Sequence, residues 1–338
     1  MSALEIAMRA AIAAGEGARG RTSPNPPVGC VVLDPTGAVA GVGATQPPGG
    51  PHAEVMALRA AGELARGGTA VVTLEPCAHH GRTPPCVLAL LDAGISEVHF
   101  AVADPFPAAA GGADQLRAAG VTVHSGLLAD AVRKGPLRAW LHHVRTGRPH
   151  VTWKFASTVD GRSAAADGTS RWISSPESRA EVHALRRKID AVIVGTATVV
   201  TDNPQLTART PEGGLAERQP LRVVVGESDI PEGSRVLDDA AETLHLRTRD
   251  PREVLAVLAG RGVVDVLLEG GPRLAGAFWE SGVVDRVLMY VAPLLLGAGT
   301  AALGELGVST MSAALPLSYE SVTMSGPDVR ISAVPAQD

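Results

Sequence analysis

Three residues with metal-binding side chains, His52, Cys77 and Cys86, occur in the N-terminal half of the 338-residue sequence. A zinc hydrolase holds its metal through about three protein ligands, leaves one coordination position for water, and uses a nearby carboxylate to move protons. One imidazole and two thiolates meet the first need, and Glu54, two residues after His52, supplies the carboxylate. We therefore predict one zinc ion per chain, bound by these three residues, with Glu54 as the catalytic proton carrier.

Each of these residues also has an ordinary structural explanation. A histidine before Ala-Glu is usually a helix start, and cysteines near a turn are often small buried apolar side chains. A zinc-stabilised binding module without catalysis is a further alternative, although structural zinc sites are usually closed by four protein ligands. The remaining cysteine, Cys30, lies in a predicted strand and is assigned to the core, because three cysteines do not suggest a disulfide framework here.

Alternating strands and helices surround the predicted metal ligands. Apolar residues at helical spacing predict a first helix that ends near glycines 15, 17 and 20. The patterns that follow predict strands at 28–33, 38–42, 70–74 and 98–103, and helices at 53–65, 86–93 and 127–143. This order predicts an α/β layered domain in which a helix start and a strand end bring His52 and Cys77 to one edge of the sheet.

The pattern restarts after the polar stretch 145–149, where we place a boundary between domains 1–147 and 148–338. Predicted strands follow at 151–156, 190–195, 221–225, 243–246, 264–268 and 286–292, separated by helices such as 176–188 and 251–260. The second half is therefore a second α/β unit. Its Gly270-Gly271-Pro272 turn leads from a strand into a helix, so its backbone N–H groups could face an anion, although such a turn also serves simply to start a helix.

The composition restricts the partners. Thirty basic and 35 acidic residues give a net charge of −5, which argues against a surface that coats a polyanion. The first residues lack the uninterrupted apolar core of a signal peptide, and no later stretch approaches the roughly 18 apolar residues of a membrane span. We expect a cytoplasmic protein that acts on a small molecule and binds neither nucleic acid nor membrane. We also expect a homo-oligomer, dimer or tetramer, formed through the second domain.

The metal-binding motifs resemble a known family. The order His-x-Glu followed by Pro-Cys and a second cysteine resembles the zinc deaminase superfamily, which removes amino groups from nucleobases. Eight residues separate Cys77 from Cys86, where the general signature has two. With this insert, the stretch 73–86 resembles the deaminase half of the bifunctional RibD family of riboflavin biosynthesis. That resemblance implies a cytidine-deaminase-like α/β/α domain acting on a diaminopyrimidinone that carries a ribosyl phosphate.

The same resemblance implies which residues bind this substrate. Asn25-Pro26-Pro27-Val28-Gly29 matches the family's upstream substrate loop, although Asn-Pro is also an ordinary turn starter. In the insert, His79, Arg82 and Thr83 offer the cationic and hydrogen-bonding groups that a phosphorylated substrate needs, unless they belong to a solvated loop.

From Val151 onward the sequence resembles the reductase half of the same family, which has a dihydrofolate-reductase-like fold and uses NADPH. The matching pieces are Lys154 with Ala156, Asp160-Gly161-Arg162, Ser170-Arg171-Trp172-Ile173-Ser174, Gly195 through Asp202-Asn203-Pro204, and Glu269-Gly270-Gly271. The resemblance implies that Asp202 and Lys154 are catalytic, and that the substrate is bound by Ser170, Arg186, Leu206, Arg209 and Glu269, unless Arg186 is a solvated helix residue. It implies cofactor contacts from Ala156, Trp172, Thr198, Asp202, Gly271, Pro272, Arg273, Leu274, Ala275, Gly276 and Ala277, unless Trp172 only fills the core. One departure, Gly226-Glu227 where relatives often carry an Asp-Ser type pair, leaves a cofactor contact there open.

Together these expectations describe a two-step enzyme of riboflavin biosynthesis. The first domain would deaminate 2,5-diamino-6-ribosylamino-4(3H)-pyrimidinone 5′-phosphate hydrolytically at C2, with Glu54 moving protons as ammonia leaves. The second would reduce the ribosyl group to ribityl with NADPH. The alternative of the same class is a nucleoside, dCMP or tRNA deaminase with an unrelated appended domain, and the long insert and the reductase-like second half count against it.

Overall fold

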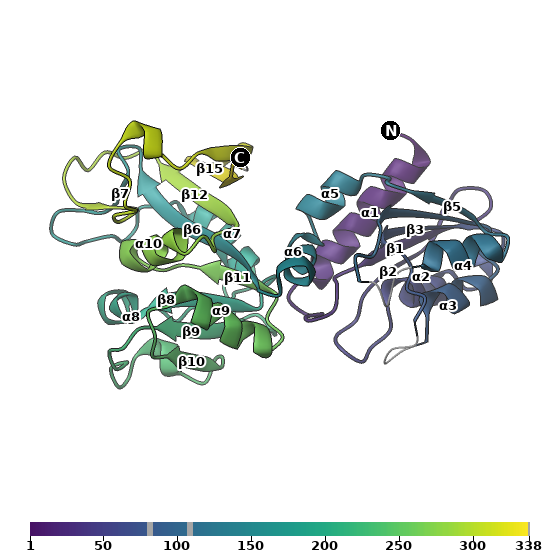
Figure 1. The fold of residues 1–338 in the computed structure, drawn as a ribbon, viewed down its shortest axis with the longest axis horizontal. Helices are drawn as coiled ribbons and strands as arrows, with labels where there is room; N and C mark the ends of the chain where they lie inside the picture. Colours follow the sequence, from purple (N-terminus) through teal and green to yellow (C-terminus); the bar gives the residue numbers. More distant parts are fainter. Residues whose placement is uncertain (80–83, 107–110, 337–338) are drawn as a thin grey trace. The chain divides into compact units, whose positions relative to one another are not determined.

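The computed structural model describes residues 1–79, 84–106 and 111–336, and it divides into two compact units, Met1–Arg148 and Pro149–Asp338 (Figure 1). Both units combine a sheet with helices, so the predicted α/β class is confirmed for each.

The sheet of the first unit has the strand order β2-β1-β3-β4-β5. β1 pairs antiparallel with β2 and with β3, whereas β3, β4 and β5 run parallel. The bounds are β1 (Gly29–Leu33), β2 (Val39–Ala44), β3 (Thr69–Leu74), β4 (Glu97–Val102) and β5 (Thr122–Ser125). β1 and β3 are buried almost along their whole length, which explains their near-continuous Val-rich sequences.

Helices cover both faces of this sheet (Figure 1). A Cβ added to Gly29 would lie 1.9 Å from the Ala11 carbonyl oxygen of α1, and one added to Gly43 would lie 2.3 Å from the Ala53 carbonyl oxygen of α2. Gly43 pairs with the residue after Gly29, so the two glycines face opposite sides of the sheet. The unit is therefore an α/β/α sandwich with α1 on one face and α2 on the other. Its helices are α1 (Ala3–Ala18), α2 (Ala53–Ala61), α3 (Cys86–Asp92), α4 (Gly112–Ala118), α5 (Ala129–Lys134) and α6 (Arg138–Thr146), with the 3-10 turn η1 (Gly62–Ala65) after α2.

One helix prediction in this unit was wrong in its bounds. The expected helix 127–143 is two helices, α5 and α6, because Gly135-Pro136 interrupts the helical backbone between them. The first helix ends at Ala18, near the glycines where its end was predicted. It runs through Gly15, whose missing side chain lets α1 lie against the chain before β1, since a Cβ there would lie 2.7 Å from the Pro27 carbonyl oxygen.

The sheet of the second unit has the order β10-β9-β8-β11-β6-β12-β15-β14. The strands from β10 to β12 run parallel, and β15 and β14 complete the sheet as antiparallel strands. The bounds are β6 (His150–Thr158), β8 (Ala191–Gly195), β9 (Leu221–Val225), β10 (Thr243–Leu246), β11 (Asp265–Leu268), β12 (Arg286–Ala292), β14 (Leu317–Ser325) and β15 (Asp328–Pro335), and a small separate pair joins β7 (Arg162–Ala164) to β13 (Thr300–Ala301).

Alternate residues of the central strands feed two apolar cores. On β8, Ile193 belongs to a cluster that includes Leu255 of α9 and Phe278 of α10. Its neighbours Val192 and Val194 belong to a cluster on the other face, with Val199 of α8. The helices are α7 (Pro176–Arg186), α8 (Thr196–Asp202), α9 (Pro251–Gly260) and α10 (Pro272–Glu280), with 3-10 turns η2 (Arg235–Leu237) and η3 (Met311–Ala313).

This arrangement brings the loops after β8, β9 and β11 to one edge of the sheet, because the carboxyl ends of parallel strands lie together. Among the helices of the described residues, none is both long and apolar enough to cross a membrane.

Candidate active sites

The first candidate site gathers one imidazole and two thiols at the carboxyl end of β3. His52 is the residue that precedes α2, Cys77 follows β3, and Cys86 is the first residue of α3. The His52 Nδ1 atom lies 3.2 Å from the Cys86 Sγ atom and 3.6 Å from the Cys77 Sγ atom. All three possible ligand atoms lie within 4.8 Å of one another. Residues from three separate segments thus converge on one point.

The donor set fits zinc. Thiolates and an imidazole are the ligands that zinc prefers in proteins, and three of them leave one position open. Cys77 accepts a hydrogen bond from the Cys86 thiol, which, together with His52 and the Cys86 backbone N–H, lowers the pKa of Cys77 to about 4. The pKa of Cys86 is raised, first by its hydrogen bond to Cys77 and then by burial. Two sulfurs that share one proton in this way are suited to a divalent cation, whose charge lets both be thiolates.

Glu54, the second residue of α2, supplies a carboxyl group at the same point. Its residue is 4% exposed, and burial, followed by the charge of Cys77, raises the pKa of Glu54 to about 7. A carboxyl group with such a pKa can both accept and donate a proton near neutral pH. The site therefore combines three side chains that could hold a metal ion with a carboxyl group suited to proton transfer.

A second buried carboxylate, Glu75, holds the loop that carries Cys77 in place. It accepts hydrogen bonds from the backbone N–H groups of Asp104 (3.2 Å), Gly111 (3.2 Å) and Ala113 (3.0 Å). The start of α4 is thereby packed against the segment beside the metal ligands. Glu75 was not among the predicted site residues, although it lies directly before the Pro-Cys motif.

The residues of this unit that were predicted to bind substrate differ in exposure, and two of them lie outside the part of the chain that the structure describes. Asn25 lies in the turn before β1, where it is half-buried and its backbone N–H donates to the Thr22 carbonyl oxygen at 2.8 Å. His79 is exposed two residues after Cys77. Arg82 and Thr83 lie outside the described residues.

The second candidate site centres on a buried ion cluster in the other unit. Glu269, directly after β11, accepts two hydrogen bonds from the Arg186 guanidinium, at 2.7 and 3.0 Å, and lies 3.6 Å from the Lys154 ammonium of β6. Although burial opposes its ionisation, Arg186 and Lys154 lower the pKa of Glu269 to about 2. Burial in turn lowers the pKa of Lys154. Three residues predicted from separate motifs thus form one cluster.

This cluster changes how Arg186 can act. Two of its guanidinium nitrogens bind Glu269, and the third donates to the Thr207 carbonyl oxygen at 3.1 Å. Because all three nitrogens of the Arg186 guanidinium bind groups of the protein, Arg186 holds Glu269 and the segment at Thr207 in position instead of binding a phosphate. Arg209 also has internal partners, the Gly213 carbonyl and the Gln205 side chain, each at 2.9 Å, but both are neutral groups, so these contacts do not neutralise its charge.

Two helix starts meet at the carboxyl edge of the second sheet. Gly195 precedes α8 and Gly271 precedes α10, and a Cβ added to Gly271 would lie 3.7 Å from the Thr198 Oγ1 atom. The first N–H groups of a helix have no partner within the helix, so this edge offers donors to an anionic group. Gly226, after β9, completes the edge with a φ of +139°, and a Cβ there would lie 2.6 Å from the Thr196 Oγ1 atom. The backbone conformation and the close approach of Thr196 therefore explain why position 226 is a glycine. This is the position at which the sequence left a cofactor contact open.

The other predicted cofactor residues differ in exposure. Trp172 is 68% exposed, with the Arg179 guanidinium carbon 4.5 Å from its ring centroid. Ala275 lies in the apolar core at 1% exposure, so its side chain packs inside the unit. Arg273 is exposed, whereas the remaining residues of this set are half-buried or buried. They are Ala156, Thr198, Gly271, Pro272, Leu274, Gly276 and Ala277.

Asp202, predicted as catalytic, ends α8 and is half-buried, and its backbone carbonyl accepts a hydrogen bond from Arg171. Ser170, next to Arg171, is also half-buried.

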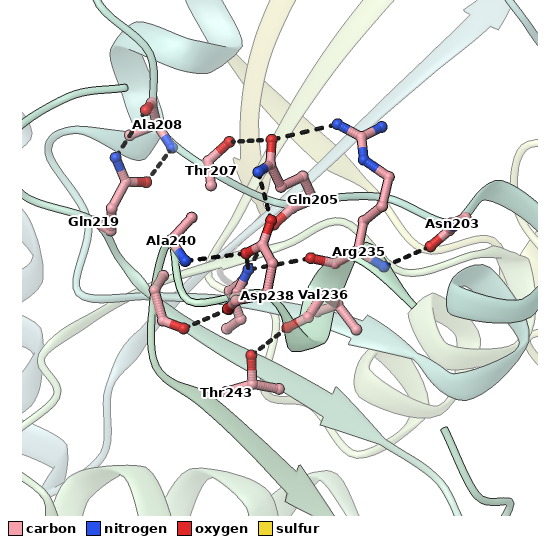
Figure 2. A network of polar contacts seen from close by, with 12 residues as sticks. Asn203, Gln205, Thr207, Ala208, Gln219, Arg235, Val236, Asp238, Ala240 and Thr243 are labelled. Carbon is pink, nitrogen blue, oxygen red and sulfur yellow. Dashed lines mark hydrogen bonds and ion pairs between the residues drawn. The ribbon is translucent and has the colours of Figure 1, made fainter. Parts of the chain in front are cut away.

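A polar network supports the chain that follows Asp202 (Figure 2). Gln205 donates to Asp238 at 2.6 Å, and Asn203 accepts the Arg235 backbone N–H at 2.8 Å. Arg222 of β9, fully buried, binds Asp238 at 2.7 Å and the Gln205 carbonyl oxygen at 3.3 Å. This network, which holds the segment containing Leu206 in its left-handed conformation (φ +58°), was not predicted. The signal that could have found it is a lone arginine inside the apolar run 221–225.

Comparison with known proteins gives the same division of the chain. Residues 1–102 match the model of the cytidine and deoxycytidylate deaminase zinc-binding region, and residues 149–331 match that of the RibD C-terminal domain. The riboflavin biosynthesis protein RibD of Mycobacterium tuberculosis is 54% identical over 334 residues, covering 99% of this chain and 98% of that protein. The protein of the same name from Escherichia coli is 38% identical and covers 96% and 97% of the two chains.

Solved structures are similar over the same length. One is a diaminohydroxyphosphoribosylaminopyrimidine deaminase/5-amino-6-(5-phosphoribosylamino)uracil reductase from Thermotoga maritima, with a TM-score of 0.90, 33% identity and coverage of 99% of each chain. Another is RibD of Acinetobacter baumannii, with a TM-score of 0.88, 35% identity and the same coverage.

Proposed function

The chain belongs to the RibD family of bifunctional deaminase–reductases of riboflavin biosynthesis, and from this membership we propose how its two sites divide the chemistry. The first unit removes an amino group by hydrolysis with zinc, and the second reduces a sugar with NADPH. The observation that carries the proposal is the convergence of His52, Cys77 and Cys86 beside the buried carboxyl group of Glu54.

In the deaminase unit, His52, Cys77 and Cys86 would hold the zinc ion. When bound, zinc supplies Lewis-acid activation of a water molecule. Glu54 accepts a proton from that water and delivers one to the departing amino nitrogen, so that water adds at C2 of the pyrimidinone and ammonia leaves. Asn25, His79, Arg82 and Thr83 are the proposed contacts to the rest of the substrate.

In the reductase unit, the edge formed by α8, α10 and Gly226 would hold NADPH, because the N–H groups of the helix starts offer donors to its phosphates. When bound, NADPH would supply a hydride for C1′ of the ribosyl group, and the bond from C1′ to the ring oxygen would break as that oxygen takes up a proton. Lys154 is the proposed proton donor because burial lowers its pKa and Glu269 holds its ammonium in place. Asp202, at the end of α8, is the second proposed catalytic group.

The substrate's phosphate and sugar would be held by the segment after Asp202. Leu206, Arg209 and Ser170 are the proposed contacts, whereas Arg186 acts by orienting Glu269, to which it is bound.

We also propose that the second unit forms a homo-oligomer through β14, the outer strand of its sheet. Tyr319 is 70% exposed, Val322 57% and Met324 65%. An exposed apolar edge strand is a surface that proteins normally pair or cover.

The test of the catalytic proposal is ammonia release from the diaminopyrimidinone phosphate by zinc-loaded protein, followed by oxidation of added NADPH. We expect ammonia to appear first and NADPH consumption to depend on it. Zinc-loaded protein that releases ammonia from cytidine or dCMP but not from the diaminopyrimidinone would contradict the proposed substrate.

A further inference from the structure

A second group of metal-binding side chains lies in the first unit, on β4 and β5. Glu97 and His99 belong to β4, and His124 belongs to β5. The His99 Nε2 atom lies 2.8 Å from the Glu97 Oε1 atom, and the His124 Nε2 atom lies 3.4 Å from the same oxygen. Both imidazoles therefore converge on one carboxylate oxygen.

The sheet itself produces this convergence. Residues two apart on a strand point to the same face, which places Glu97 beside His99. In the parallel pairing of the two strands, His99 lies opposite His124, and their rings stack with centroids 4.7 Å apart. The register of the sheet thus fixes the spacing of the three side chains.

The cluster is separate from the zinc triad. Glu97 pairs with Thr69, at the start of β3, whereas Cys77 follows the other end of that strand. His99 pairs with Val71, which pairs with Val31. Val31 shares the α1 face with Gly29, so the cluster lies on the face opposite α2, the helix that follows His52.

The chemistry of the three groups suits a divalent transition metal. Two imidazoles and a carboxylate form one of the recurring three-ligand sets for zinc, with water in the remaining position. Bonds of about 2.0–2.1 Å in a tetrahedral site separate neighbouring ligand atoms by about 3.3 Å. The three ligand atoms here lie within 4.8 Å of one another, so modest side-chain rotations would close the set.

The exposure of the three side chains increases from His99 through Glu97 to His124. The His99 side chain is 11% exposed, the Glu97 side chain 37% and the His124 side chain 54%. The inner ligand is therefore held by packing while the outer two face solvent, from which an ion and its water could enter.

We propose that Glu97, His99 and His124 form a second site for a divalent transition metal such as Zn²⁺, which ties the outer strand β5 to β4. The ion would replace the shared carboxylate oxygen as the point on which both imidazoles converge. This site is independent of the proposed deaminase chemistry.

The test is the number of zinc ions that the full chain retains after equilibrium dialysis against Zn²⁺, with thermal unfolding followed in parallel. His124→Ala removes the most exposed ligand and should leave the fold intact. Thr122→Ala, on the same face of the same strand, is the matched control. His52→Ala removes one ligand of the zinc triad formed with Cys77 and Cys86, and it leaves the cluster of Glu97, His99 and His124 complete.

We expect two ions per chain in the unaltered protein and in Thr122→Ala, one in His124→Ala, and one in His52→Ala. Added Zn²⁺ should raise the melting temperature of His52→Ala but not that of the double variant that carries both His52→Ala and His124→Ala. A second ion that persists in His124→Ala, or an unaltered chain that binds one ion only, would overturn the proposal.

Discussion

Glu269 is the central residue of the ion cluster in the second unit, because it stands between two cations in a largely buried position. Its carboxylate binds Arg186 through two hydrogen bonds and lies 3.6 Å from the Lys154 ammonium. Removing the negative charge leaves two cations facing each other away from water, which is costly even where the intact ion pair itself adds little.

We predict that Glu269→Gln lowers the free energy of unfolding of the second unit by on the order of 3 kcal/mol. Denaturant unfolding followed by the fluorescence of the buried Trp153 measures this change. Glu212→Gln, at an exposed carboxylate in the same unit, should stay within about 0.5 kcal/mol of the unaltered protein.

The loss should also depend on pH in a defined direction. A carboxylate whose pKa is about 2 when folded, against an ordinary value of 4.5, contributes stability that is complete above 4.5 and is lost as the pH falls towards 2. The difference between the unaltered protein and Glu269→Gln should therefore shrink over that interval. A difference that stays constant from neutral pH down to pH 2 would show that the ion cluster is not its source.

At the scale of the element, the edge between α8, α10 and the end of β9 depends on close approach of the backbone at Gly226. We predict that Gly226→Ala raises the dissociation constant of NADPH about tenfold, since a side chain at a φ of +139° costs about 1–3 kcal/mol and would also meet Thr196. Titration calorimetry with NADPH measures it. Gly214→Ala, where a Cβ would lie 3.6 Å from its nearest neighbour, Thr210 Oγ1, is the control and should bind NADPH normally.

The segment after α8 is held by Arg222 of β9, which binds the Gln205 carbonyl oxygen and the Asp238 carboxylate. We predict that Arg222→Met raises the reductase KM for its substrate about tenfold, a loss of ~1.4 kcal/mol, with a smaller effect on kcat. Arg222→Lys should recover part of the loss, because a lysine can still reach Asp238. Arg247→Met, at an exposed ion pair with Asp229, serves as control. Equal KM values in Arg222→Met and Arg247→Met would remove Arg222 from any role in positioning.

The elements themselves show what the sequence can and cannot reveal. The strands 221–225, 243–246 and 286–292 were predicted with the bounds that the structure has, because a proline, a glycine or a charged residue lies directly at each of their ends. Helix 127–143 was predicted as one because its apolar spacing continues across the Gly135-Pro136 break. α4 and β5 were missed, and β5 is mostly exposed, so it lacks the apolar pattern that identifies a strand.

The same contrast holds for the sites. The proximity of His52, Glu54, Cys77 and Cys86 could be predicted from the sequence because few other chemistries use that order of side chains. The supporting groups, Glu75 and the network around Arg222, are held by contacts with residues distant in the sequence, which no local pattern encodes.

At the scale of the whole molecule, the exposed apolar strand β14 sets the expectation for assembly. We predict that Val322→Lys shifts the sedimentation coefficient of the chain from that of an oligomer to that of a monomer, because a charge on the edge strand blocks pairing. Val39→Lys, with a similar exposure on β2 of the other unit, should leave the assembly unchanged. A chain that sediments as a monomer before any substitution would rule out the proposed oligomer.

The chain divides into two units, each with its own sheet and core. We therefore expect that a substitution in one site abolishes one activity and leaves the other unchanged. Glu54 lies in the first unit, and Asp202 and Lys154 lie in the second. Chelation of the metal should likewise stop the first reaction without touching the second.

The most direct test of this account is to measure both reactions on the same pair of variants. Glu54→Gln should release no ammonia from the diaminopyrimidinone phosphate, yet should oxidise NADPH normally when given the substrate already deaminated. Asp202→Asn should release ammonia normally and lose NADPH oxidation. If Glu54→Gln also stopped the reduction of deaminated substrate while remaining folded, the assignment of two separate sites to the two units would be wrong.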